Sequence, residues 1–336
     1  MRKTNRTRKP KDIGSPVLES VLAIVAASKH VTTDAARIAA HAQWLAYEEL
    51  PFPEFVLPFG VGSSDEAIDF ILVSTALNFA FTDFATSVKF EAEYQGRMWS
   101  DSEGLFACMK RALDGGVPFL DGAFLAQVTK RDLDGIFTGN IEMPMNAERA
   151  DVLRAVGATL AAKYGGRFHN FVRAGKPLAY DRGRGLVERL VSEFPRFRDE
   201  SRYGRHTVRI YKLAQLGVWM LHACLSKRGG FRLQDAARLT AFADYIVPVA
   251  LRVMGIQRYS AKLERTIRAG AMVARDSAEE VEIRAHTIYA VALLTEEINL
   301  LRPREKQVIN AQVDARLWTH YHATFWPHHL TRTTMY

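Results

Sequence analysis

Apolar positions recur along most of this chain at the spacing of an amphipathic helix. These helical periods cover 148–163, 207–226, 234–254, 258–269, 278–301 and 306–323. Two predicted helices begin with a capping box, in which a serine and a glutamate three residues later satisfy two backbone donors; the pairs are Ser100 with Glu103 and Ser277 with Glu280. The pattern predicts a mainly α-helical fold without internal repeats.

Residues that start and stop helices mark the first two helices. Ser15-Pro16 predicts a helix start before an apolar run, because the hydroxyl accepts an unpaired N–H and the proline presets φ. Asp34 predicts the cap of a second helix that continues through Tyr47 and ends before Pro51. Residues 69–84 are strongly apolar, and a buried helix and a buried strand both fit this stretch.

Residues 87–99 carry the clearest strand signal. Apolar and polar residues alternate on both sides of Gln95-Gly96, a dipeptide suited to a tight turn. We expect a β-hairpin here, as a small insert in a single helical domain of residues 15–336.

Basic residues are concentrated at the start of the chain. Residues 1–12 hold six lysines and arginines and one aspartate, so they account for five of the eight net positive charges. We expect residues 1–14 to form a disordered basic tail. The nearly balanced remainder disfavours a protein that follows the phosphates of a nucleic acid.

Composition limits the class of protein further. Hydrophobic residues make up 48% of the chain, which suits a packed globular core, and no apolar stretch has the length that a bilayer crossing demands. Cys108 and Cys224 are the only two cysteines. This number excludes a disulfide framework and a cysteine-rich metal site, and it fits a reducing, cytoplasmic setting.

General catalytic motifs are missing from the sequence. It contains no GxGxxG after a predicted strand, no GxxxxGK[ST], no HExxH and no GxSxG, so the usual signals of nucleotide-binding, phosphoryl-transfer, metalloprotease and hydrolase sites are lacking. Four histidines lie close together near the C-terminus, with Asp314 as the only nearby carboxylate. We interpret them as packing residues and expect neither a metal nor a cofactor; they are His320, His322, His328 and His329.

Carboxylates in apolar surroundings are more informative. Asp244 lies in a run that we predict to be helical, and burial of an ionised carboxylate is costly unless it is paired or hydrogen-bonded. It therefore either caps a neighbouring element or serves a site. Asp314 and Trp318, four residues apart, share a helix face and offer a carboxylate beside a π surface to a flat heterocycle. The alternative is a solvated acid beside a core tryptophan.

Two further charged residues leave similar alternatives. Asp199 either pairs with a ligand or is neutralised by its neighbours Arg196 and Arg198. Lys212, in a mixed apolar helix, either binds a phosphate or extends its ammonium to water.

A set of short strings occurs in order between about Trp44 and Tyr336. The strings are Leu77-Asn78-Phe79-Ala80-Phe81, Ala112-Leu113-Asp114-Gly115-Gly116-Val117-Pro118, Phe194-Pro195-Arg196-Phe197-Arg198-Asp199, Tyr211-Lys212-Leu213-Ala214-Gln215, Phe242-Ala243-Asp244-Tyr245, Glu280-Val281-Glu282-Ile283-Arg284, and Asp314 with Leu317-Trp318. The ordered set resembles the queuosine salvage proteins, which are queuosine 5′-phosphate N-glycosylases. This resemblance implies a single mostly helical domain, similar to the helix-hairpin-helix DNA glycosylases, that hydrolyses the nucleotide to release queuine.

The resemblance also implies roles for individual residues. The aspartate of the family's Phe-Ala-Asp-Tyr string falls on Asp244, which would be the catalytic carboxylate between Phe242 and Tyr245. The acid of the Asp-x-x-Leu-Trp string falls on Asp314, which would hold the base. The Tyr-Lys string makes Lys212 the first candidate for the 5′-phosphate; the others are Arg209, Arg284 and Arg332.

The chemistry of queuine sharpens these expectations. It is a 7-deazaguanine with a cationic secondary amine, so Asp314 or Asp199 would pair with the amine, and Phe242 and Trp318 would enclose the ring. Because the base lacks the ring nitrogen that purine hydrolases protonate, the carboxylate on the sugar side must stabilise more of the oxocarbenium-like charge. Asn78, in the first string, completes the expected substrate-binding set.

Two positions depart from the family pattern. Tyr47-Glu48-Glu49-Leu50 stands where a relative has His-Glu-Leu, so Tyr47 would stack on the base or donate to it in place of that histidine. Thr319 stands where an acid is sometimes found, which removes one partner for the amine.

Two other function classes stay open. A helical nucleic-acid glycosylase fits the fold analogy and the basic tail, although the remaining charge is nearly balanced. A non-catalytic helical nucleotide-binding or interaction protein would use Asp244 and Asp314 as structural acids. We expect queuosine 5′-phosphate and queuine as partners, with no stable nucleic acid and no membrane, and the sequence does not indicate an oligomeric state.

Overall fold

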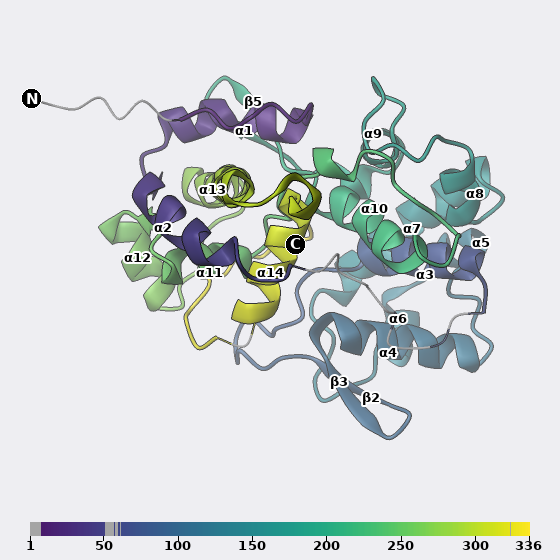
Figure 1. The fold of residues 1–336 in the computed structure, drawn as a ribbon. Helices are drawn as coiled ribbons and strands as arrows, with labels where there is room; N and C mark the ends of the chain where they lie inside the picture. The colour runs from purple at the N-terminus through teal and green to yellow at the C-terminus, as the bar shows by residue number, and fades with distance from the viewer. Residues whose placement is uncertain (1–7, 51–56, 58–59, 61, 323) are drawn as a thin grey trace, which may run out of the picture. The chain divides into compact units, whose positions relative to one another are not determined.

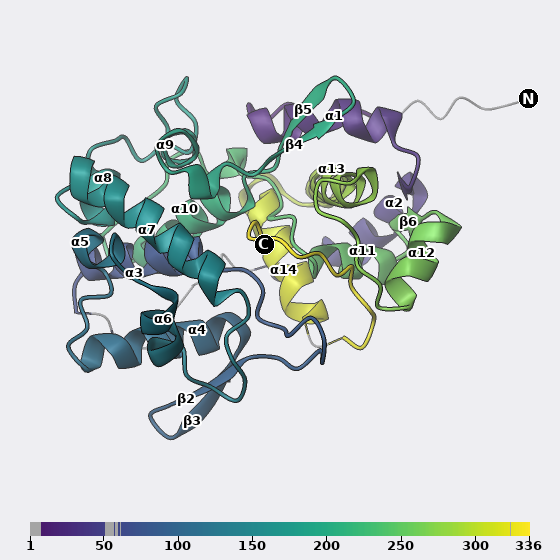
Figure 2. The same ribbon diagram turned by 180° about the vertical axis from the view of Figure 1, so that it is seen from behind.

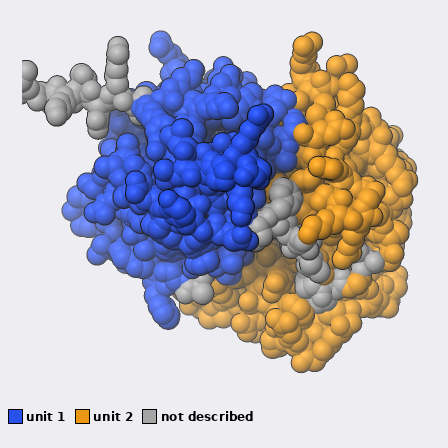
Figure 3. All heavy atoms as spheres, viewed as in Figure 1, with its two compact units in different colours: residues 1–53, 199–215, 235–332 blue, residues 54–198, 216–234, 333–336 orange. Residues whose placement is uncertain are grey.

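The computed structural model describes residues 8–50, 57, 60, 62–322 and 324–336. These residues form fourteen α-helices, short 3₁₀ helices and three two-stranded antiparallel sheets, which confirms a mainly helical fold (Figures 1 and 2). The chain divides into two compact units, coloured in Figure 3. Unit 1 comprises residues 1–53, 199–215 and 235–332, and unit 2 comprises residues 54–198, 216–234 and 333–336.

Unit 1 is built around a long buried helix. Its elements are α1 (Pro16–Ala27), β1 (Val31–Thr33), α2 (Ala35–Leu45), β4 (Glu200–Tyr203), β5 (His206–Arg209), α11 (Val247–Val253), β6 (Gln257–Tyr259), α12 (Ala261–Arg268), α13 (Ala278–Leu301) and α14 (Asn310–Tyr321). Almost every residue of α13 from 280 to 295 is buried, because α1, α2, α11 and α14 all pack against it. Figure 1 shows α13 with α1 and α2 beside it.

Two small sheets complete unit 1. Strand β1 pairs antiparallel with β6, and Val31 lies opposite Tyr259. Strands β4 and β5 form a hairpin that packs beside α1, as Figure 2 shows from behind. Helix α10 (Lys212–Leu225) begins in unit 1 and continues in unit 2.

Unit 2 holds the remaining helices and the predicted hairpin. Its elements are α3 (Ser64–Ala76), β2 (Glu91–Tyr94), β3 (Arg97–Ser100), α4 (Asp101–Asp114), α5 (Gly122–Leu125), α6 (Lys130–Ile136), α7 (Asn146–Lys163), α8 (Phe168–Arg173) and α9 (Leu186–Glu193). The hairpin is confirmed, with Gln95 and Gly96 in the left-handed region at φ 53° and 73°. The apolar stretch that fitted a helix or a strand forms α3, which is buried from Ala67 to Ala76.

The predicted starts of the first two helices are confirmed. Helix α1 begins at Pro16, but the predicted cap is wrong, because the Ser15 hydroxyl accepts no hydrogen bond from the first turn. Asp34 caps α2 by accepting hydrogen bonds from two backbone N–H groups. Helix α2 ends at Leu45, two residues before Tyr47, and Pro51 lies outside the described residues.

The two predicted capping boxes are only partly present. Helix α4 does start after Ser100, but the serine side chain makes no capping hydrogen bond. Ser277 accepts from the backbone of Glu280 at 3.3 Å, whereas the Glu280 carboxylate accepts from Asp276 rather than from Ser277.

Several predicted helices begin late, and one prediction is largely wrong. The span 207–226 starts as strand β5, 258–269 starts as β6, and the last helix starts at Asn310. Of 234–254 only Val247–Val253 forms an α-helix, so Asp244 does not lie within a helix. Pro248 in the first turn of α11 explains this start, because proline lacks an N–H and fits only where no intrahelical donor is required.

The basic tail is described only in part. Residues 1–7 lie outside the described residues. Arg8 forms ion pairs with Glu296 and Glu297 of α13, and its carbonyl accepts from Tyr289 at 2.6 Å. Disorder of the tail and a single domain over 15–336 stay predictions. Among the described residues, no helix is both long and apolar enough to cross a membrane.

Candidate active site

The stretch from Leu239 to Ile246, here called the 239–246 segment, has no regular secondary structure. Side chains from neighbouring elements satisfy its backbone groups instead. At its start, Asn310 of α14 donates to the Leu239 carbonyl at 3.2 Å, and Gln215 of α10 accepts from the Thr240 N–H at 3.0 Å. These tethers fix the segment although it lacks a hydrogen-bond ladder of its own.

Helix α14 holds the middle of the segment through two residues. Asp314 accepts from the backbone N–H of Phe242 at 2.9 Å, and the Trp318 indole donates to the Asp244 carboxylate at 3.1 Å. Their spacing of four residues places both on one helix face, as predicted. The solvated alternative for Asp314 is wrong, because only 3% of this residue is exposed, and Trp318 is half-buried against the core of unit 1.

Asp244 is a buried carboxylate with three N–H donors. Besides the Trp318 indole, the backbone N–H groups of Ile246 and Val247 donate to it at 2.8 and 3.1 Å. The last two bonds cap the start of α11, so the capping alternative is confirmed. Together the three donors fix the position of the carboxylate.

Asp314 keeps its proton at neutral pH. Burial and, to a lesser degree, the neighbouring charge of Asp244 together raise the pKa of Asp314 to about 8, although the Phe242 N–H and the Lys212 ammonium act in the opposite direction. A carboxylic acid therefore lies beside a carboxylate at neutral pH. In such a pair one aspartate, Asp314, provides a carboxylic acid and the other, Asp244, provides a carboxylate.

Asp199 and Arg284, both predicted to bind substrate, bind each other. The guanidinium of Arg284 contacts both carboxylate oxygens of Asp199, at 2.9 and 2.6 Å, and donates from Nε to the Ala243 carbonyl at 3.0 Å. Glu280 lies 3.5 Å from the same guanidinium. Asp199 is thus neutralised by Arg284 on α13, not by its neighbours Arg196 and Arg198.

The phosphate candidates differ in burial. Lys212 is the first residue of α10 and only 5% exposed, so its ammonium does not extend to bulk water as one alternative required. Its backbone N–H donates to Asp199 at 3.3 Å. Arg209 and Arg332 are exposed, and Arg209 lies 3.9 Å from Glu200.

The remaining predicted site residues differ in how far they are buried. Phe242 is buried in the 239–246 segment, and half-buried Tyr245 lies 4.7 Å from the ring of His328. Asn78 follows α3 in unit 2 and is half-buried. Tyr47 is 83% exposed.

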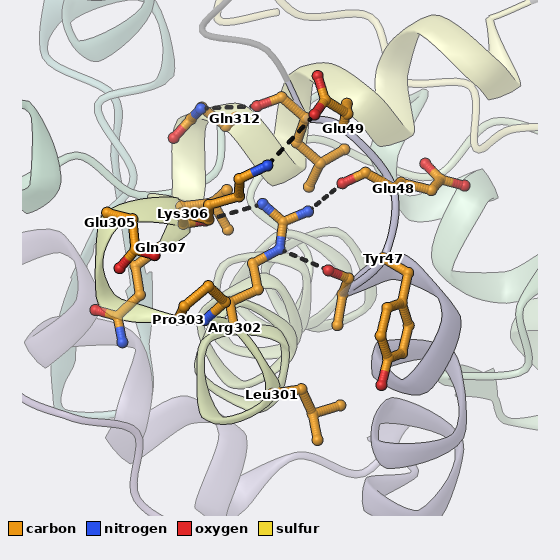
Figure 4. A pocket seen from close by; sticks show the side chains of 13 residues that line it. Tyr47, Glu48, Glu49, Leu301, Arg302, Pro303, Glu305, Lys306, Gln307 and Gln312 are labelled. Atoms are coloured by element: carbon orange, nitrogen blue, oxygen red, sulfur yellow. Dashed lines mark hydrogen bonds and ion pairs between the residues drawn. The ribbon is translucent and has the colours of Figure 1, made fainter.

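Tyr47 lines a cavity of about 420 Å³ between the end of α2 and the loop after α13 (Figure 4). Arg302 lies in this cavity, and its guanidinium donates to the carbonyls of Ala46 and Lys306, both at 3.0 Å. None of the other predicted site residues lines it.

Two of the four C-terminal histidines, His322 and His328, lie beside aromatic rings, whereas His320 is exposed. The ring of His322 lies 4.3 Å from that of Trp318, and burial lowers the pKa of His329 to about 3. Within the described part of the chain, no group of three His, Cys, Asp or Glu side chains is placed to hold a metal ion.

Two residues that fix the site were not singled out in the sequence. Gln215 and Asn310 are buried and tether the start of the 239–246 segment. A polar residue in the apolar run of α10 is a detectable signal for Gln215. Asn310 carries no such signal, since an asparagine near a helix start is usually a cap.

The site can stabilise positive charge beside a flat ligand. It offers a charged carboxylate with fixed donors, a neutral carboxylic acid, and the rings of Phe242 and Trp318. This combination suits cleavage of a glycosidic bond, in which cationic charge develops on the sugar.

Comparisons with known proteins identify the family. The family model described as queuosine salvage protein matches residues 60–336. A protein of Sphaerobacter thermophilus is 34% identical over 95% of this chain and 97% of its own, and one of Mus musculus is 29% identical over 76% and 77%. Both are named queuosine 5′-phosphate N-glycosylase/hydrolase. The chain therefore belongs to the queuosine salvage protein family.

Proposed function

We propose that this protein hydrolyses the N-glycosidic bond of queuosine 5′-phosphate and releases queuine for tRNA modification. The observation that carries the proposal is the Asp244 carboxylate, held by three N–H donors beside the acid Asp314. The names of the relatives support the same reaction and substrate.

In the proposed reaction the bond between C1′ and the base nitrogen breaks, and its electron pair leaves with the base. Asp244 stabilises the oxocarbenium-like ribose or attacks it. Water supplies the hydroxyl at C1′, and its other proton goes to the nitrogen of the departing base. The donors to Asp244 are backbone and indole N–H groups that the fold already fixes. They therefore do not have to move as charge develops on the ribose.

Base recognition is assigned to Asp314 and the aromatic rings. On binding, Asp314 would release its proton to solvent and pair with the cationic amine of queuine. Phe242 and Trp318 would enclose the ring, with Tyr245 next to Asp244 in the chain. Guanine lacks the amine and would leave the buried carboxyl without a partner, which gives specificity.

The 5′-phosphate is assigned to Lys212. Its burial near Asp314 and at the start of α10 supports this choice over the exposed Arg209 and Arg332. Asn78 and Tyr47 are kept as base contacts on the family resemblance alone.

Chromatography tests the reaction directly. The pure protein is incubated with queuosine 5′-phosphate, or with guanosine 5′-phosphate as control, and free base is measured. We expect queuine from the first nucleotide only, and a loss of at least about 100-fold in turnover for Asp244→Asn. Absence of both release and binding would favour a non-catalytic interaction protein.

Four accompanying proposals concern the whole protein. A likeness to helix-hairpin-helix DNA glycosylases and a single domain over 15–336 follow from the family resemblance. A cytoplasmic location is supported by two free, buried cysteines, Cys108 and Cys224. We propose no stable nucleic-acid partner, because the charge outside the tail is nearly balanced.

A further inference from the structure

We propose that the buried ion pair between Asp199 and Arg284 is a positioning device that fixes Asp244 for the reaction without contacting the substrate. The proposal rests on the proposed function, because it gives Asp244 the catalytic role. It replaces the expectation that these two residues bind the nucleotide.

Arg284 connects Asp199 to the peptide beside Asp244. Its Nε donates to the carbonyl of Ala243, the residue directly before Asp244. Both terminal nitrogens contact Asp199, which fixes the plane of the guanidinium, since a bidentate pair has a single favourable geometry. The direction of the Nε–H group, and with it the Ala243 peptide, is therefore set by Asp199.

Asp199 in turn holds the chain at the start of α10. Its carboxylate also accepts from the backbone N–H of Lys212, and its carbonyl accepts from Ile210 and Tyr211. The same ion pair thus joins the peptide beside Asp244 to the first residue of α10. A shift of either partner would change the distance between the proposed sugar and phosphate contacts.

Both residues of the ion pair are buried away from solvent. Arg284 is 1% exposed and Asp199 is 3% exposed, and every guanidinium nitrogen of Arg284 has a protein acceptor. A substrate phosphate would have to displace a buried carboxylate, which leaves an uncompensated charge. If Arg284 instead positions Asp244 through the Ala243 carbonyl, no buried carboxylate has to be displaced.

The test uses Arg284→Lys and Asp199→Asn in the full chain. Lysine keeps the charge but loses the Nε donor and the planar fork. We expect kcat for queuine release to fall about 100-fold for Arg284→Lys, because small misplacements of reacting groups have effects of this size. The Kd of queuine should stay near the wild-type value, since no base contact is removed.

Asp199→Asn is the milder variant. Asparagine keeps the side-chain volume and one acceptor, and Glu280 remains near the guanidinium as a charge partner, so this variant should fold. We expect a smaller loss of kcat, and a double variant whose loss is less than the product of the two single losses, because both act on one contact.

Two matched controls separate positioning from general destabilisation. Arg252 is another buried arginine of unit 1 that contacts one carboxylate, Glu264 at 2.8 Å, and one carbonyl, Pro327 at 2.7 Å. Glu282 on α13 is buried and accepts from the backbone of β1 and from Tyr203. Arg252→Lys and Glu282→Gln should lower the melting temperature and leave kcat unchanged well below it.

The outcomes are distinguishable. If wild type releases queuine and Asp244→Asn does not, while folded Arg284→Lys and Asp199→Asn keep the wild-type kcat, the positioning role is wrong and the proposed function stands. The positioning role is also wrong if the controls lose as much kcat as the pair variants. If wild type releases no queuine, the proposed function itself fails.

Discussion

At the scale of single residues, the site depends on two aspartates in different charge states. Asp244 has three N–H donors, whereas Asp314 has one and is fully enclosed. The donors fix the position of the first, and burial raises the pKa of the second so that it keeps its proton. The sequence identified both acids, but it could not distinguish their states, because the donors come from distant elements.

The raised pKa of Asp314 predicts how stability depends on pH. Between about pH 4 and 8 the folded protein holds a proton at Asp314 that the unfolded chain has lost, so the free energy of unfolding falls as pH rises through this window. Asp314→Asn removes this contribution. Thermal unfolding of both proteins should be followed from pH 4 to 8. The melting temperature of wild type should fall relative to that of Asp314→Asn as pH rises; parallel curves would contradict this.

Lys212 predicts a preference for phosphate. Lys212→Gln should reduce kcat/KM for queuosine 5′-phosphate by about 10-fold or more, since a charged hydrogen bond is lost, and should change the value for unphosphorylated queuosine much less. Arg209→Gln is the control, because Arg209 is exposed and lies near Glu200. Equal losses on both substrates would assign Lys212 a structural role.

At the scale of elements, the prediction failed where the site lies. The apolar residues of 234–254 occur at helical spacing, yet Ala241 and its neighbours pack into the core from an extended segment. Side chains of Gln215, Arg284 and Asp314 replace the helical hydrogen bonds. Apolar spacing reports burial but not these long-range partners, whereas α13, with a local cap and an uninterrupted pattern, was predicted with its observed bounds.

The hydrogen bond from α14 to the 239–246 segment can be tested at Trp318. Trp318→Phe keeps an aromatic ring, although a smaller one, and removes the indole donor to Asp244. A hydrogen bond to a charged group is worth about 1.5–3 kcal/mol, so kcat should fall about 10- to 100-fold. Trp44→Phe, which removes an exposed indole donor to His41, is the control and should keep full activity.

Packing of α7 on α5 predicts a difference between two glycines. A Cβ at Gly157 would lie 2.3 Å from the backbone nitrogen of Ala126, whereas one at Gly135 would meet nothing within 4 Å. Gly157→Ala should therefore destabilise the fold by several kcal/mol, in the upper range for single substitutions. Gly135→Ala should stabilise it by about 0.5–1 kcal/mol. Chemical denaturation measures both.

At the scale of the whole molecule, the sequence predicted helical content and family but not the division into two units. Unit 1 consists of three separate chain segments, and such a division arises from long-range contacts that composition and local patterns do not record. The family strings were informative because they preserve the order of residues that the fold later brings together, such as Asp199 with Arg284 and Phe242 with Asp314.

The basic tail should be dispensable for catalysis. A chain that starts at Gly14 loses the ion pairs of Arg8, whose side chain is 48% exposed, and the hydrogen bond from Tyr289 to the Arg8 carbonyl. The expected loss of stability is therefore about 1–2 kcal/mol. The truncated chain keeps the Gly14 carbonyl that accepts from Arg238 at 3.1 Å. Turnover of queuosine 5′-phosphate should equal that of the full chain, and a large loss would give the tail a role in the reaction.

The tethering of the 239–246 segment also sets the order in which the site can be built. Phe242 and Asp244 find their partners on α14, 72 and 74 residues later in the chain. During synthesis the segment therefore leaves the ribosome well before the groups that shape it, and contacts of such sequence separation form late because the intervening loop must close first. Asp244 acquires its indole donor only when nearly the whole chain has emerged, so an incomplete chain carries the proposed catalytic residue without the contacts that shape its site.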